Sequence, residues 1–136
     1  MKRVLIVEDN AANRALVTIF LKRDGYRVSL AEDGLRGVEL AQAEKPDMIL
    51  MDLEMPGMDG REATRRIKAD PATSRIPIVA LTAHTAKADI ESAITAGFDG
   101  FVSKPISHSR PMEKVHSFPE GHDSARGEGV SVGRRR

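Results

Sequence analysis

The chain has 136 residues, of which 40% are hydrophobic and 30% are charged, and its formal net charge at pH 7 is +1. This length fits one globular domain with its own core, and the absence of cysteine excludes disulfides, thiolate nucleophiles and cysteine-ligated zinc or iron–sulfur sites. The near-balanced charge gives no reason to expect nucleic acid or an anionic membrane as the main partner, so function is expected to come from local sites.

The first apolar run of the chain, from Val4 to Val7, is short and ends at Glu8 and Asp9. Because it is too short for the apolar region of a signal peptide or for a membrane-spanning helix, we expect a cytoplasmic protein with no membrane partner. A run of this length is typical of a β-strand.

Similar β-branched or aliphatic runs recur along the chain, and the intervals between them are long enough for helices. We interpret the runs as strands at residues 4–7, 28–31, 48–51, 78–81 and 101–103. Helices are predicted between them at residues 11–23, 35–44, 61–69 and 86–96. The runs MILM and IVAL lack polar alternation, which is typical of parallel strands covered by helices on both faces. The pattern predicts an α/β fold with a five-stranded parallel sheet.

Local signals mark the ends of several predicted elements. The helix at residues 11–23 has apolar residues at spacings of three and four that face one side: Ala12, Ala15, Leu16, Ile19 and Phe20. Gly25 and Gly97 follow two of the helices, where a residue free to adopt positive φ is expected. After the second strand, Glu32-Asp33-Gly34 is interpreted as a turn and helix cap, which would suit a strand at the edge of the sheet.

The character of the sequence changes after Lys104-Pro105. A fifth helix is predicted at about residues 109–118, provided that Pro111 falls in its first turn. Residues 119–136 contain several glycines and almost no large apolar side chains, so we expect a disordered C-terminal tail. The terminal arginine triplet is interpreted as solvated, since no aromatic platform or basic helix accompanies it. A single domain is thus predicted over residues 1–118.

Reactive side chains collect at the predicted strand ends. In an open parallel sheet, ligands bind beyond the carboxyl ends of the strands. Glu8 and Asp9 follow the first strand, and Asp52 follows the third. Thr82 follows the fourth strand and Lys104 follows the fifth. Four strand ends therefore carry groups suited to chemistry.

These groups suit metal-assisted phosphoryl transfer. Glu8, Asp9 and Asp52 at one sheet edge would repel one another, and a hard divalent cation bound by oxygen ligands would relieve that repulsion. A site with only two or three carboxylates, in which the cation keeps several waters, is typical of Mg²⁺ bound to a phosphate. With Lys104 and Thr82 stabilising the phosphoryl oxygens, Asp52 is predicted to attack the phosphorus and form an aspartyl phosphate.

Taken singly, these residues have ordinary structural explanations. On its own, Asp52 fits a loop carboxylate or a helix cap, Thr82 fits a helix N-cap, and Lys104 fits an exposed cation. Together at one edge, with an acidic pair after the first strand, they favour a phosphoryl site.

The segments LIVEDN, ILMDLEMPGMDG, IVALTA and FVSKP occur in this order and resemble the successive signatures of a response-regulator receiver domain, over roughly residues 2–107. The resemblance implies a flavodoxin-like, doubly wound sheet with strand order 2-1-3-4-5 and helices on both faces. It also implies a histidine kinase or histidine phosphotransfer protein as the phosphoryl donor to Asp52. The implied protein is a signalling receiver that catalyses only its own phosphoryl transfer and autodephosphorylation.

The resemblance also implies roles for individual residues around Mg²⁺. Asp9 and Asp52 would bind the ion directly, together with the main-chain carbonyl of Glu54, and Glu8 would act through a water. Among the other members of the site, Thr82 would hydrogen-bond the phosphate and Lys104 would ion-pair with it.

A conformational switch is implied at two further positions. Thr82 would move toward the phosphate, and Phe101 occupies the aromatic switch position of the family, although a plain core aromatic is an equal interpretation. Output is expected through contact with a downstream protein target, by a monomer or a weak phosphorylation-dependent dimer. The chain looks most like single-domain cell-division-type receivers or receivers of hybrid kinases, and the weak fifth helix at residues 109–118 puts the usual output face in doubt.

Two other hypotheses compete with a phosphorylated receiver. The first is a metal-dependent phosphohydrolase with an aspartyl-phosphate intermediate on Asp52 and Glu54 as its acid/base. The short loops argue against it, because such an enzyme needs a substrate pocket built by a cap or insertions. The second is a receiver-like module that is never phosphorylated, and it is disfavoured because all of the expected site residues are present.

Overall fold

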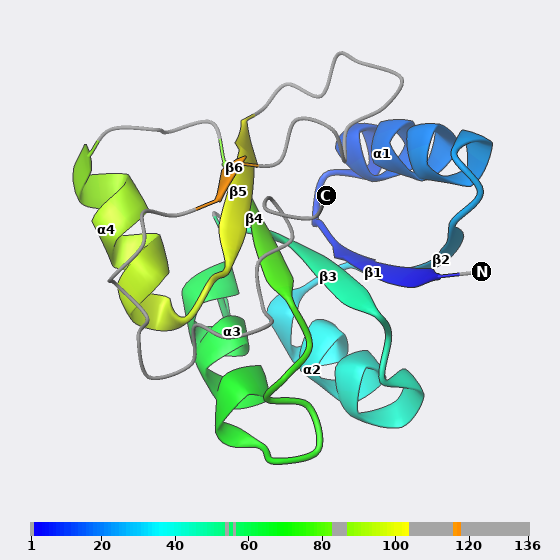
Figure 1. Ribbon diagram of the computed structural model, residues 1–136. Coiled ribbons are helices and arrows are strands. Elements are labelled where there is room, and N and C mark those ends of the chain that lie inside the picture. Colours follow the sequence, from blue (N-terminus) through cyan, green and yellow to red (C-terminus); the bar gives the residue numbers. More distant parts are fainter. Residues whose placement is uncertain (1, 54, 56, 83–86, 104–115, 118–136) are drawn as a thin grey trace.

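The computed structural model describes residues 2–53, 55, 57–82, 87–103 and 116–117 (Figure 1). Its strands are β1 (Arg3–Val7), β2 (Arg27–Ala31), β3 (Met48–Asp52), β4 (Ile78–Thr82), β5 (Gly100–Ser103) and β6 (His116–Ser117). Its helices are α1 (Ala11–Arg23), α2 (Gly34–Glu44), α3 (Gly60–Ala69) and α4 (Lys87–Ala96). Each predicted strand and each of the first four predicted helices is present, with bounds that agree to within one residue wherever the chain is described.

The strands form one sheet in the order β2-β1-β3-β4-β5-β6. The first five strands are mutually parallel, which confirms the predicted order 2-1-3-4-5. β2 lies at one edge, as its turn-like ending indicated. At the other edge, β6 pairs with β5 in the antiparallel direction.

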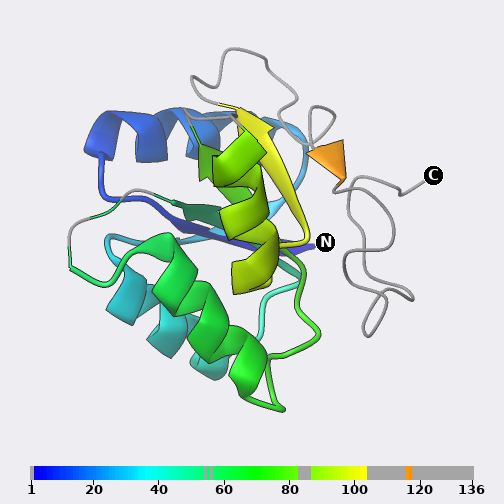
Figure 2. The ribbon, with the colours of Figure 1, turned by 90° about the vertical axis from the view of Figure 1, so that its left-hand side faces the viewer.

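Helices cover both faces of this sheet. Figure 2 shows α1 on one side and α2 and α3 on the other. Successive side chains of β1 point to opposite faces of the sheet, so β1 contributes to the core on both faces. Val4 and Ile6 pack in the hydrophobic cluster that includes α1, whereas Leu5 and Val7 pack in the cluster that includes α2, α3 and α4. All five residues of β4 are buried, as expected for a strand covered on both faces.

Carboxylate and amide side chains cap the first three helices. Asn10 accepts from the amide of Asn13 at the start of α1, and Asp33 accepts from the amide of Arg36 at the start of α2. The predicted cap at Asp33 is therefore confirmed. Asp59 does the same for α3. Each such cap satisfies an amide without a helical partner and stabilises the helix by about 1 kcal/mol.

The buried face of α1 differs from its predicted apolar stripe. Val17 and Leu21 are buried against the sheet, whereas Ile19 is 52% exposed. Leu16 and Phe20 of the predicted stripe are half-buried, and its alanines at positions 12 and 15 are exposed. Val17 and Leu21 are four residues apart and pack in one cluster with Val4 and Ile6 of β1, so the buried face of α1 lies beside the predicted stripe and is set by how the helix packs on the sheet.

The C-terminal segment also differs from expectation. His116 and Ser117 form β6, with His116 opposite Phe101 of β5, so the helix predicted to about residue 118 is wrong at these two positions. Serine and histidine are weaker helix formers than alanine or leucine, and the edge of β5 offers these two residues a strand to pair with. The rest of the predicted fifth helix and the predicted tail lie outside the described residues. Along the described part of the chain, no helix combines the length and the apolar character that crossing a membrane requires.

Candidate functional site

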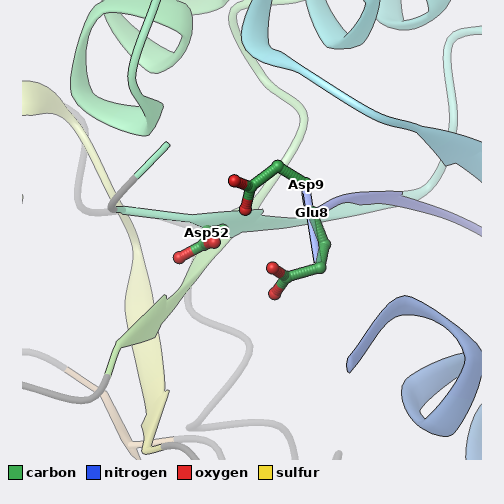
Figure 3. Close-up of side chains that lie close together, drawn as sticks. All are labelled: Glu8, Asp9 and Asp52. Carbon is green, nitrogen blue, oxygen red and sulfur yellow. The ribbon is translucent and has the colours of Figure 1, made fainter. Parts of the chain in front are cut away.

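Three carboxylates gather at the carboxyl end of the sheet (Figure 3). Asp52 is the last residue of β3, and Glu8 and Asp9 follow directly after β1. β1 and β3 are neighbours, with Val7 opposite Met51, so the residues that follow meet at one edge. One carboxylate oxygen from each of the three lies within 4.8 Å of the others, which confirms the predicted acidic cluster.

The cluster is buried at its base and open at its rim. Glu8 is 0% exposed and Asp52 is 1% exposed, whereas Asp9 is exposed. Water therefore reaches Asp9 more readily than it reaches the other two. Carboxylates this close in a water-poor site repel one another strongly, and a divalent cation would relieve that repulsion. All three donors are oxygens, so the set fits a hard cation such as Mg²⁺ or Ca²⁺.

Hydrogen bonds from α1 and its cap hold the turn after β1. The amide of Asn10 donates to Oε2 of Glu8 at 3.1 Å, and Nη1 of Arg14 donates to the main-chain carbonyl of Glu8 at 2.8 Å. The amide of Glu8 donates to the carbonyl of Ala31 at 3.1 Å and so continues the pairing of β1 with β2. Hydrogen bonds thus hold the side chain, the main-chain amide and the main-chain carbonyl of Glu8.

Asn10 and Arg14 were not among the predicted site residues. The sequence carried a signal for Asn10, because asparagine just before an amphipathic segment is a typical helix cap. It carried none for Arg14. An arginine in the first turns of a helix is usually solvated, and only the packing of α1 beside the β1 end brings Arg14 to the carbonyl of Glu8.

The neighbouring strand places Thr82 at the same edge. In β4, Leu81 lies opposite Asp52, and the amide of Leu53 donates to the carbonyl of Leu81 at 3.1 Å. Thr82 is the next residue, the last of β4, and is 1% exposed. One strand further, Phe101 of β5 is half-buried and packs against the cluster on the α2, α3 and α4 side. Glu54 and Lys104, also predicted at this site, lie outside the described residues.

Comparison with known proteins gives a consistent result. The family model described as the response regulator receiver domain matches residues 4–116. A polar-differentiation response regulator, DivK of Brucella anthropi, is 38% identical over 117 residues, which cover 86% of this chain and 95% of that protein.

Solved structures show the same likeness. The receiver domain of the sensor histidine kinase PA1611 from Pseudomonas aeruginosa is 40% identical, with a TM-score of 0.73 over 78% of this chain and 87% of that one, and it has a magnesium ion coordinated in its active site cleft. The chemotaxis protein CheY4 of Vibrio cholerae is 31% identical, with a TM-score of 0.76 over 79% of this chain and 89% of that one.

Proposed function

Because this chain belongs to the response regulator receiver domain family, we propose that it is a receiver in which Asp52 accepts a phosphoryl group from the phosphohistidine of a histidine kinase or phosphotransfer protein. The observation that carries the proposal is the convergence of Glu8, Asp9 and Asp52 at the carboxyl end of the sheet. A surface carboxylate would serve poorly as a nucleophile of fixed direction, whereas Asp52 ends a buried strand.

In the proposed reaction, a carboxylate oxygen of Asp52 attacks the phosphorus and the phosphorus–nitrogen bond to the donor imidazole breaks. The electron pair of that bond stays on the imidazole nitrogen, which takes up a proton. A bound Mg²⁺ supplies positive charge to the phosphoryl oxygens and to the crowded carboxylates. Asp9, Asp52 and the main-chain carbonyl of Glu54 are proposed as its direct ligands, with Glu8 acting through a water.

The remaining proposed roles belong to the strand ends next to Asp52. Thr82, buried at the end of β4, would donate its hydroxyl to a phosphoryl oxygen, and Lys104 would ion-pair with the phosphate. Phosphorylation adds about two negative charges, so Thr82 would be drawn toward them. The half-buried Phe101 on β5 is the proposed second part of the switch.

The comparisons give no support to the phosphohydrolase hypothesis, since the matches are to signalling receivers. We propose that output occurs through contact with a downstream protein, by a monomer or a weak dimer that forms on phosphorylation. A cytoplasmic location stays a prediction.

The proposal is tested by intact-protein mass after incubation with acetyl phosphate. Wild type is expected to gain one phosphoryl group with Mg²⁺ and none with a chelator, because the acidic cluster needs a cation before it can accept a phosphate. Asp52→Asn is expected to gain none, since an amide is not a nucleophile here. Unchanged uptake by Asp52→Asn would refute the proposed acceptor.

Asp59→Asn is the matched control for this experiment. It makes the same chemical change seven positions further on, in the loop that follows β3, where Asp59 caps α3. Asparagine caps helices about as well as aspartate, so this variant should keep its fold and its phosphoryl uptake.

A further inference from the structure

Arg14 reaches from the first turn of α1 back to the turn after β1. Nη1 of Arg14 donates to the main-chain carbonyl of Glu8 at 2.8 Å, and the residue is half-buried. The main chain at Arg14 is itself fixed in the helix: its amide donates to the carbonyl of Asn10 at 2.9 Å, and its carbonyl accepts from Oγ1 of Thr18 at 2.6 Å. The guanidinium is therefore anchored on α1 while it binds the turn that carries the acidic cluster.

This contact with Glu8 bears directly on Asp9, which is exposed and offers one of the three carboxylates of the acidic cluster (Figure 3). The carbonyl of Glu8 and the amide of Asp9 belong to one planar peptide group, so a fixed carbonyl oxygen fixes the direction in which the chain enters Asp9. Along the described part of the chain, the pairing of β1 with β2 extends to the amide of Glu8, which donates to the carbonyl of Ala31. The next peptide group is the one that Arg14 holds.

The charge of Arg14 by itself opposes the binding of a cation. Arginine stays protonated in proteins, and this guanidinium is bonded to a residue of the acidic cluster. Coulomb's law alone then predicts that loss of the positive charge tightens the binding of Mg²⁺. A role in positioning predicts the opposite, because without the bond the turn between Glu8 and Asp9 must be ordered when the metal binds. The two effects therefore differ in sign and can be told apart.

We propose that Arg14 is a positioning residue for the divalent cation: by holding the peptide group that leads to Asp9, it keeps that carboxylate beside the rest of the acidic cluster. This inference rests on the proposed function, since it concerns the same magnesium site. Arg14 acts through the main chain of Glu8, so it is an outer partner of the site and not a ligand. Loss of an outer partner usually weakens metal binding by about tenfold to a hundredfold.

The test is isothermal titration calorimetry of magnesium chloride into the full chain, as wild type and as Arg14→Met. Methionine keeps an unbranched stem and a similar helix propensity, and it removes both the donor and the charge. The variant is expected to bind Mg²⁺ about tenfold more weakly. With acetyl phosphate, the Mg²⁺ concentration for half-maximal phosphoryl uptake should rise by the same factor. Unchanged or tighter magnesium binding by a folded Arg14→Met protein would overturn the inference.

Arg23→Met is the matched control. It removes the same charge from the last turn of α1, where Arg23 is exposed. Its magnesium affinity should stay within about twofold of wild type, because solvent and salt screen an exposed charge. Equal losses of affinity in both variants would overturn the inference. Wild type that shows neither magnesium binding nor phosphoryl uptake would refute the proposed function itself, a result distinct from an Arg14→Met protein that behaves as wild type.

NMR of isotope-labelled arginine side chains tests the same link in wild type, so the result does not depend on how a variant folds. Linkage is reciprocal: if the Arg14 bond strengthens magnesium binding about tenfold, bound Mg²⁺ must favour the formed bond over the broken one by the same factor. Exchange of the Arg14 guanidinium protons with water should therefore slow when Mg²⁺ is added, whereas exchange at the exposed Arg23 should not change. Arg14 protons that exchange equally fast with and without saturating Mg²⁺ would overturn the inference.

Discussion

At the scale of single residues, the carboxylates of the acidic cluster lower the stability of the cation-free fold, and the proposed function requires them. Glu8 is fully buried, and one of its oxygens lies within 4.8 Å of oxygens from Asp9 and Asp52. Folding without a cation brings these charges together, which costs free energy. Glutamine at position 8 would keep the shape and the oxygen that accepts from the Asn10 amide.

We therefore predict that Glu8→Gln raises the free energy of unfolding by about 1–2 kcal/mol in the absence of divalent cation. The same variant should bind Mg²⁺ more weakly than wild type. Urea unfolding with and without Mg²⁺ measures both effects. Glu32→Gln removes an exposed carboxylate from the turn after β2 and should leave both quantities near wild type. A less stable Glu8→Gln protein in chelator would contradict the idea of mutual repulsion.

The residues of the cluster were predictable because parallel strands end together. Glu8, Asp9 and Asp52 each follow an apolar run, and this alone places them at one edge of a parallel sheet. Arg14 was not assigned to the site, because its role depends on which main-chain carbonyl its guanidinium meets. Such contacts arise from helix placement and leave no local pattern in the sequence.

At the scale of elements, a buried ion pair joins α3 to the turn before β5. Nζ of Lys68 donates to Oδ2 of Asp99 at 3.1 Å and to the carbonyls of Ser74 at 3.2 Å and Ile76 at 2.8 Å. The same Asp99 oxygen accepts from the amide of Ile78, the first residue of β4, at 2.9 Å. The Lys68 side chain is 14% exposed and that of Asp99 is 0% exposed. This network fixes the end of the sheet opposite Asp52.

Lys68→Met is predicted to lower the free energy of unfolding by about 3 kcal/mol, because it leaves the buried carboxylate of Asp99 without its cation. Phosphoryl uptake by the folded protein should keep its wild-type rate, since the network lies at the far end of the strands. Urea unfolding and acetyl phosphate assays measure the two effects. The exposed Lys22, changed to methionine, provides the control and should alter neither. Loss of uptake in a folded Lys68→Met protein would show that this network reaches the site.

Helices and strands that have their own sequence pattern were predictable. Features that depend on contacts with other elements were not. The bounds of α1 follow from its spacing and its cap. Its buried face does not, because the helix carries two adjacent apolar faces and its packing on the sheet decides that Val17 and Leu21 are the buried residues. β6 has no pattern of its own. Two residues become a strand only because the edge of β5 offers hydrogen-bonding partners far away in the sequence.

At the scale of the whole molecule, the site and the fold are thermodynamically coupled. A cation that binds only the folded chain stabilises it by an amount that grows with the logarithm of its concentration, about 2.7 kcal/mol at one hundred times the dissociation constant. The midpoint of urea unfolding of wild type should therefore rise steadily with Mg²⁺. Asp52→Asn removes one proposed ligand and should show a much smaller rise. A wild-type midpoint that does not respond to millimolar Mg²⁺ would contradict a magnesium site in the acidic cluster.

The architecture was the most predictable feature of the molecule, for a physical reason. Strands without polar alternation must be covered on both faces, and helical intervals between them supply that cover through parallel crossovers. The sheet order β2-β1-β3-β4-β5 then follows from the resemblance to the receiver family and is what the structure shows. The antiparallel addition of β6 lies beyond this rule, because it depends on a sheet edge and not on a crossover.

Asp52 is tested as the phosphoryl acceptor by locating the modified residue after the reaction. Wild-type protein is incubated with acetyl phosphate and Mg²⁺, then reduced with borohydride, which converts an acyl phosphate of aspartate into homoserine, and the peptides are sequenced by mass spectrometry. We predict homoserine at position 52 and nowhere else, with none after incubation in chelator. Homoserine at Asp9 or another carboxylate, with Asp52 unmodified, would contradict the assignment of the nucleophile.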